Sequence, residues 1–282
     1  MEVPQLRDPC LIAGFYGWSD AGSVSSDVLA YLAEALQPRL IGTIEDEHFI
    51  NYVLNRPVAQ IEEGVIRQME PCQTELRCWG NPGSGSDLVC LLGKEPHMNW
   101  FAYVDTILDA VKRLGIKRIF TIGGVQDATS HTRPPIVSAV GSSPYALRRI
   151  LTSDETIKLA DYHGPVSIHS CLIKRCMEKG MEAVSLWGHV PAYLQKNPRV
   201  VTKIITILNK AVGMDCPLEM LRHQTLDLEH KLQEALSRDP NLRRLVESLE
   251  NEGSSEKLPG EEKVIRLNDF LRRDLRKDPD PL

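Results

Sequence analysis

The sequence has 282 residues, of which 42% are hydrophobic and 25% are charged, and its formal net charge is −5. These proportions are ordinary for a soluble globular protein and allow one large α/β domain with an appendage, or two small domains. The negative charge gives no electrostatic support for general binding to nucleic acid or to an anionic membrane.

The seven cysteines are scattered along the chain without a Cys-x-x-Cys pair, and several of them lie inside apolar runs. An odd count without regular spacing is unlike a disulfide framework and indicates a reducing compartment. No signal peptide opens the chain, and no run reaches about 18 consecutive apolar residues. We therefore expect a cytoplasmic protein without membrane spans.

The first elements in the chain are a strand, a sharp turn and a helix. An apolar run at residues 10–15 leads into the turn at residues 17–22, Gly-Trp-Ser-Asp-Ala-Gly, and helical periodicity follows from Val24 to Leu36. The glycines permit backbone angles that are closed to other residues, and Asp20 or Ser23 can cap the helix. Because open α/β sheets hold their ligands in such loops, we expect this turn to border a surface site.

The rest of the first 213 residues alternates between strands and helices. The strand at 117–122 is short and nearly all apolar, as in the middle of a parallel sheet. This alternation predicts a three-layer α/β/α sandwich. The other expected strands are 39–45, 64–69, 73–79, 87–92, 136–140 and 183–187, and the other helices are 97–114, 167–179 and 198–212; residues 46–63 are expected as an excursion.

After Gly213 the pattern changes to a stripe of leucines, which Arg238-Asp239-Pro240 interrupts and which then resumes. This pattern predicts a helical hairpin that packs on the α/β body or within the same oligomer, in preference to a foreign partner. The expected organisation is an α/β/α domain at 1–213, a hairpin extension at 214–251 and a charged, loosely ordered tail at 252–282. One short amphipathic helix is expected in the tail, through Val264, Leu267, Phe270 and Leu271.

Polar and aromatic side chains gather just past the ends of four predicted strands, and a parallel sheet would bring these ends to one edge. We therefore expect a shared crevice there, with a fifth contribution from the loop before the helix at 167. The candidate ligand-binding residues are Trp18, Asp20, Glu95, His131, Arg133, His163, His189 and Tyr193.

Each candidate also has a structural interpretation. For Asp20 helix capping is favoured, and tryptophans such as Trp18 are more often core or interface residues than ligand-stacking ones. A lone histidine such as His169 is more often packed or solvated than catalytic. The planar guanidinium of Arg133 suits a carboxylate or phosphate, but it is equally suited to holding a loop through backbone carbonyls.

The common catalytic signatures are absent from the sequence. There is no phosphate-binding loop, dinucleotide fingerprint, nucleophile elbow or helical zinc spacing, and no nucleophile can be assigned with its base. We expect no metal and no cofactor.

Five segments nevertheless stand out in order along the chain: Gly17–Gly22, Glu95–Trp100, Gly123-Gly124 through His131–Pro134, Tyr162–Pro165 and Gly188–Tyr193. Together they resemble the PAC2 family, the proteasome assembly chaperone 2-like proteins. The resemblance spans about residues 8–250 and implies a phosphorylase/hydrolase-like α/β/α domain with a helical extension, and a homo-oligomer. Eukaryotic and archaeal relatives include assembly factors for the 20S proteasome or proteins that bind it.

Some bacterial members of the family have carried an ATP-grasp or carboxylate-amine ligase label, but no nucleotide cleft with metal-holding acidic residues can be placed in this chain. Two positions depart from the family pattern. The sequence ends Asp280-Pro281-Leu282 instead of the hydrophobic-Tyr-x ending of relatives that dock on the proteasome, and His97 follows Glu95-Pro96 where an acidic or amide residue is expected. We therefore expect no docking through the tail and assign no fixed role to the loop at His97.

The favoured hypothesis is a non-enzymatic, chaperone-like assembly or binding protein that works as a homo-oligomer and meets a proteasome-like or other multimeric partner. The alternative is a small-molecule hydrolase, ligase or sensor that binds an anionic ligand near His131 and Arg133. The absence of an assignable acid, base and nucleophile favours the first.

Overall fold

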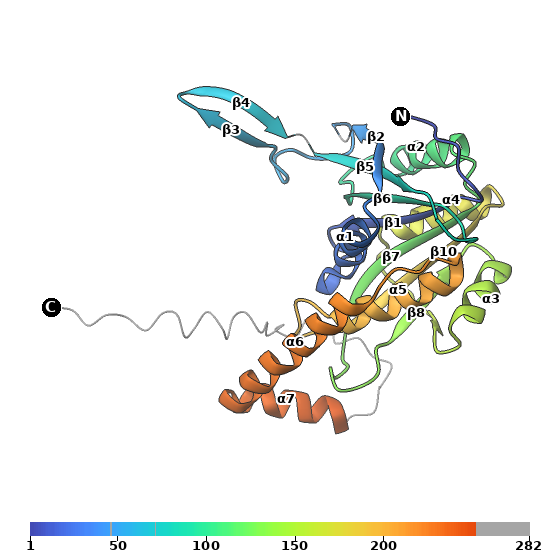
Figure 1. The fold of residues 1–282 in the computed structure, drawn as a ribbon. Coiled ribbons are helices and arrows are strands. Elements are labelled where there is room, and N and C mark those ends of the chain that lie inside the picture. Colours follow the sequence, from blue (N-terminus) through green and yellow to red (C-terminus); the bar gives the residue numbers. More distant parts are fainter. Residues whose placement is uncertain (46, 71, 252–282) are drawn as a thin grey trace.

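The structure is a computed structural model that describes residues 1–45, 47–70 and 72–251 (Figure 1). Its centre is β1 (Cys10–Tyr16), which is buried at every position except the last. β6 (Leu88–Lys94) and β7 (Arg118–Asp127) flank β1, and β10 (Glu182–Pro191) pairs with β7. All three pairings are parallel, so these four strands end at the same edge of the sheet.

Antiparallel strands extend this parallel centre on both sides. On one side lie β5 (Gln73–Trp79) and then β2 (Arg39–Glu45); on the other lies β8 (Val137–Gly141), followed by the two-residue β9 (Lys158–Leu159), which pairs with β8 in parallel. The described residues thus form an eight-stranded sheet in the order β2-β5-β6-β1-β7-β10-β8-β9.

Helices cover both faces of the sheet, and each face has its own apolar core. The three-layer α/β/α prediction is therefore confirmed. One face carries α1 (Val24–Leu36), α3 (Pro144–Ser153) and α5 (Pro198–Val212), and the other carries α2 (Trp100–Arg113) and α4 (Ile168–Glu178). A short 3-10 turn, η1 (Ala21–Ser23), precedes α1.

The leucine stripe forms the predicted pair of helices, α6 (Glu219–Arg238) and α7 (Pro240–Asn251). Leu221, Leu232 and Leu242 are buried in the same core as α5, so this pair packs on the α/β body. The predicted amphipathic helix through Val264, Leu267, Phe270 and Leu271 lies outside the described residues.

Three elements were not predicted: α3, β9 and the strand β3 (Val58–Glu62). β3 pairs with the predicted β4 (Val65–Glu70) in a separate two-stranded sheet. This hairpin lies in the sequence between β2 and β5, and it projects away from the body (Figure 1).

Two further facts bear on the expected class of protein. No helix in the described part of the chain is long and apolar enough to cross a bilayer. All seven cysteines, which lie between residues 10 and 216, are free thiols.

Candidate functional site

The expected shared edge exists, because β6, β1, β7 and β10 are parallel neighbours. Both β7 and β10 run further than predicted, to Asp127 and Pro191. His189 therefore lies on β10 itself, not in a loop after it, which corrects its predicted position. The loop with His131 and Arg133 still follows the end of β7.

Glu95 connects three elements at this edge. Its Oε2 accepts a hydrogen bond from the Trp18 backbone N–H (3.2 Å), and its Oε1 accepts one from the Ile168 N–H (2.9 Å). The second bond places a carboxylate at the amino end of α4, where unpaired N–H groups favour negative charge. Gly17 fits against Glu95 with a φ of 140°, and an added Cβ would lie 3.0 Å from the Glu95 Cβ. Glu95 thus holds the first turn against α4.

Trp18 and Asp20 behave differently within that turn. The Trp18 side chain is 65% exposed. Asp20 accepts hydrogen bonds from the backbone N–H of Ser26 (3.1 Å) and from its hydroxyl (2.7 Å), so it caps the first turn of α1 as the structural interpretation predicts. Burial raises the pKa of Asp20. Trp18 is the side chain of this turn that a partner can reach.

His169 is fully buried beside the same turn. Its ring lies between Phe15 and Trp187, with centroids 5.3 and 5.2 Å away. Nε2 lies 3.1 Å from the Ser19 hydroxyl, whereas Nδ1 has no hydrogen-bond partner among the described residues. Burial lowers the pKa of His169 to about 3, so the ring is neutral at physiological pH. The structural interpretation of His169 as a packed residue is confirmed.

His131 and Tyr193 form a second group at the edge. The Tyr193 hydroxyl accepts from the His131 backbone N–H (2.8 Å) and lies 2.7 Å from Nδ1 of the same residue, to which it donates. Burial lowers the pKa of His131, which is consistent with Nδ1 acting as an acceptor. The Arg199 guanidinium donates to the His131 carbonyl oxygen. These contacts fix the loop after β7.

Arg133 binds the end of α7. Its guanidinium donates to the Glu250 carbonyl oxygen (2.6 Å), while the Glu250 carboxylate accepts from the hydroxyls of Thr132 (2.7 Å) and Ser130 (3.4 Å). Of the two roles open to Arg133, the structure shows the one in which it bonds a backbone carbonyl. The cavity left in this loop is about 10 Å³, which is about the space for one water.

A hydrogen-bonded chain that the sequence did not reveal runs through His189. Its Nδ1 lies 2.8 Å from Asp127 Oδ2, and its Nε2 lies 2.9 Å from the Ser138 hydroxyl. The hydrogen bond from His189 lowers the pKa of Asp127, so the carboxylate accepts from Nδ1–H.

This connectivity is that of a serine–histidine–aspartate triad, but the surroundings differ from an acyl-transfer site. Ser138 lies within β8 and is only 7% exposed. His189 borders a cavity of about 10 Å³, which cannot hold an acyl substrate. In this structure the chain of bonds therefore ties β7, β10 and β8 together.

The predicted residues thus fall into separate groups. Trp18, Asp20 and Glu95 lie around the first turn, and His131, Arg133, His189 and Tyr193 lie around the loop after β7. His163 is exposed and makes no hydrogen bond within the described part of the chain.

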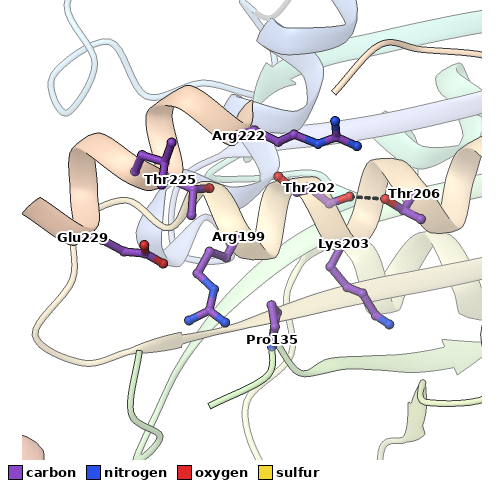
Figure 2. A pocket seen from close by; sticks show the side chains of 9 residues that line it. Pro135, Arg199, Thr202, Lys203, Thr206, Arg222, Thr225 and Glu229 are labelled. Carbon is purple, nitrogen blue, oxygen red and sulfur yellow. Dashed lines mark hydrogen bonds between the residues drawn. The ribbon is translucent and has the colours of Figure 1, made fainter. Parts of the chain in front are cut away.

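A larger groove lies elsewhere, between α5 and α6, with a volume of about 500 Å³ (Figure 2). Arg199 and Lys203 project from α5 on either side of Pro135, and Glu229 of α6 extends toward Arg199. Lys203 is held by Asp154 Oδ2 (2.5 Å). This groove was not predicted, because it exists only where the helical extension meets the body. Its lining residues are Pro135, Arg199, Thr202, Lys203, Thr206, Arg222, Thr225, Leu226 and Glu229.

Comparison with known proteins identifies the family of this chain. The sequence model of the PAC2 family matches residues 14–236, which is most of the chain. The chain belongs to the PAC2 family. In this PAC2 protein the five ordered segments that resemble the family surround the carboxyl ends of the parallel strands or directly precede α4.

Solved structures agree with this assignment. A proteasome-assembly chaperone homologue from Mycobacterium tuberculosis is 29% identical, covers 84% of this chain and 99% of its own, and superimposes with a TM-score of 0.75. A PAC2 family protein from Streptomyces avermitilis is 27% identical over 80% of this chain and 95% of its own, with a TM-score of 0.72. PbaB, an archaeal proteasome activator from Pyrococcus furiosus, is 20% identical over 83% of this chain and 95% of its own; its TM-score of 0.67 shows the shared fold.

No curated protein matches this PAC2 chain significantly in sequence. Within the described residues, no group of three or more His, Cys, Asp or Glu side chains is arranged to hold a metal ion.

Proposed function

We propose that this PAC2 protein is a non-enzymatic, chaperone-like assembly or binding protein that works as a homo-oligomer and docks on a multimeric partner such as a proteasome core. The observation that carries this proposal is its 29% identity, over 84% of the chain, to a proteasome-assembly chaperone homologue. Fold membership alone would be an analogy, so the local geometry has to support the same conclusion.

The local geometry favours binding over catalysis. The polar side chains at the strand ends are engaged by their own chain: Glu95 by α4, Arg133 by α7 and His189 by Asp127 and Ser138. The space beside the last two is about 10 Å³. Side chains held in this way stiffen an edge that a partner can meet as a preformed surface.

Of the eight candidate residues, Trp18 and His163 are the ones with exposed side chains, so a protein partner would touch them first. Exposed tryptophans are frequent energetic centres of protein interfaces. We therefore assign Trp18 as the main contact residue for the partner.

The test is native mass spectrometry of the protein isolated from its own cells, compared between the natural chain and Trp18→Ala. A complex with a multimeric partner, weakened in Trp18→Ala, is expected. Tyr145→Ala serves as the control, because Tyr145 is exposed to a similar degree (57%) but lies on α3. Recovery of the protein with no foreign subunit under mild conditions would count against the proposal.

The second candidate function is a small-molecule hydrolase, ligase or sensor. The Asp127–His189–Ser138 chain is the observation that favours it. A serine-directed fluorophosphonate probe distinguishes the two functions. Labelling that is lost in Ser138→Ala would support catalysis, and no labelling is expected from a serine that is only 7% exposed.

A further inference from the structure

The β3–β4 hairpin is amphipathic. Cross-strand partners share a face, and Ala59 pairs with Met69 while Ile61 pairs with Ile66, so these four side chains form one apolar face. The register shifts between Gln60 and Ile61, which leaves Arg67 as the extra residue of a bulge. Because of this bulge, both pairs lie on the same face of the hairpin.

The opposite face of the hairpin is mostly polar. Gln60 pairs with Gln68, and each of these glutamines donates to a glutamate on its own strand, Glu62 (2.7 Å) and Glu70 (3.3 Å). Two-residue spacing on a strand places such partners on the same face, which supports the assignment of faces.

Nothing in the described chain covers the apolar face. Every residue from 58 to 70 is exposed, and Ile61, Ile66 and Met69 are 63%, 63% and 61% exposed. A lone two-stranded hairpin is at best marginally stable in water, so a bare apolar face on one needs a partner surface.

A second bare apolar surface lies at the other end of the sheet. All nine residues from 158 to 166 are exposed, and Leu159, Tyr162 and Val166 are 56%, 55% and 53% exposed. This edge segment contains β9, the last strand of the sheet, and β9 pairs only with β8 among the described strands. The hairpin is inserted between β2 and β5, which form the end of the eight-stranded sheet opposite to β9.

We propose that the β3–β4 hairpin is an arm whose apolar face packs on the edge segment, residues 158–166, of a second copy of this chain. A head-to-tail contact of this kind joins the two bare surfaces, and where the rotation between neighbours closes, the resulting ring covers both surfaces in every copy. A two-fold contact between two hairpins would leave the β9 end bare.

The area and charge of the two surfaces fit this occupant. On the apolar face of the hairpin, Ile61, Ile66 and Met69 are 61–63% exposed. At on the order of 100 Å² each they supply roughly 300 Å², which would form the apolar centre of a contact in which each partner buries about 800 Å². In the edge segment Lys158 and Asp161 balance each other, so apolar area and not charge drives the contact.

This inference rests on the homo-oligomer of the proposed function, and the oligomeric state of the purified full chain tests it separately from partner capture in cells. Light scattering coupled to size exclusion would compare the natural chain with Ile66→Lys on the apolar face and Leu159→Lys on the edge segment. The matched control is Gln68→Lys, which places the same charge on the polar face of the same hairpin. Circular dichroism establishes that each variant is folded.

We expect the natural chain and Gln68→Lys to be oligomers and the other two variants to be monomers, with a dissociation constant raised at least about 100-fold. A mixture of Ile66→Lys and Leu159→Lys should form dimers, because one variant retains the intact edge and the other the intact arm. A monomeric natural chain, an oligomeric Leu159→Lys variant or a mixture without dimers would each overturn the proposal. Loss of assembly in Gln68→Lys would do the same.

Discussion

Replacing His169 with phenylalanine tests whether the buried ring at the first turn is neutral. The substitution keeps an aromatic ring between Phe15 and Trp187 and removes both ring nitrogens, of which Nδ1 has no partner in the structure. The group that titrates is thereby lost while the packing is largely retained.

The magnitude follows from linkage. The pKa of His169 is lowered by burial from 6.5 to about 3, so the unfolded chain binds the proton more tightly than the folded one. The resulting loss of stability is absent above pH 6.5, grows as the pH falls and levels off below about pH 3. At pH 5 the unfolded state has gained about 2 kcal/mol, since each pH unit below 6.5 contributes about 1.4 kcal/mol.

The assay is urea unfolding of the natural chain and of His169→Phe at pH 7 and pH 5. The fall in unfolding free energy between the two pH values should be smaller in the variant by about 2 kcal/mol. His163→Phe, at an exposed histidine, corrects for the loss of one histidine from the chain. An equal fall in the natural chain and in His169→Phe would refute the conclusion that the ring is held neutral.

Three further predictions concern stability. Glu250→Ala should lower the unfolding free energy by about 1 kcal/mol, because the loop after β7 loses its carboxylate acceptor; thermal denaturation measures this. Gly124→Ala should cost more than about 2 kcal/mol, because its Cβ would lie 2.1 Å from a backbone carbonyl oxygen, whereas Gly80→Ala meets nothing within 4 Å and should be nearly neutral in the same assay. Burial alone would raise the pKa of Asp154, but hydrogen bonds from Lys203 and a threonine outweigh it and lower the pKa to about 2. That pair should therefore stabilise the fold above about pH 3.8 and lose its effect as the pH falls toward 2, and acid titration of Lys203→Met should show the dependence reduced.

The sheet and its main helices could be predicted from the sequence because periodicity reports burial. β1 is apolar throughout and α5 carries an apolar stripe. In the structure these apolar residues are the buried ones. α3 is different: only Ala146 and Ile150 of its ten residues are buried, so its apolar signal is weak. The one local sign of its start was Ser143 before Pro144, and the Ser143 side chain does accept from the Ala146 N–H.

The candidate site was only partly predictable for another physical reason. Strand ends indicate which residues approach one edge, but not which atoms bond there. Asp127, Ser138 and His189 come from three strands whose adjacency is fixed by the order of the sheet, and no local spacing encodes it. Likewise, the role of Arg133 depends on where α7 docks, which is decided by packing over a hundred residues later in the chain.

The central position of β1 has a consequence for biosynthesis. β1 is complete at residue 16, but its neighbours β6 and β7 begin at residues 88 and 118. At about 5–20 residues per second, a ribosome needs on the order of 4–16 s to make the roughly eighty residues from the end of β1 to the end of β6. Throughout that interval the most apolar strand of the protein is outside or leaving the ribosome without a pairing partner. A protein proposed to assist the assembly of others is therefore itself a nascent chain that depends on early protection of its first strand.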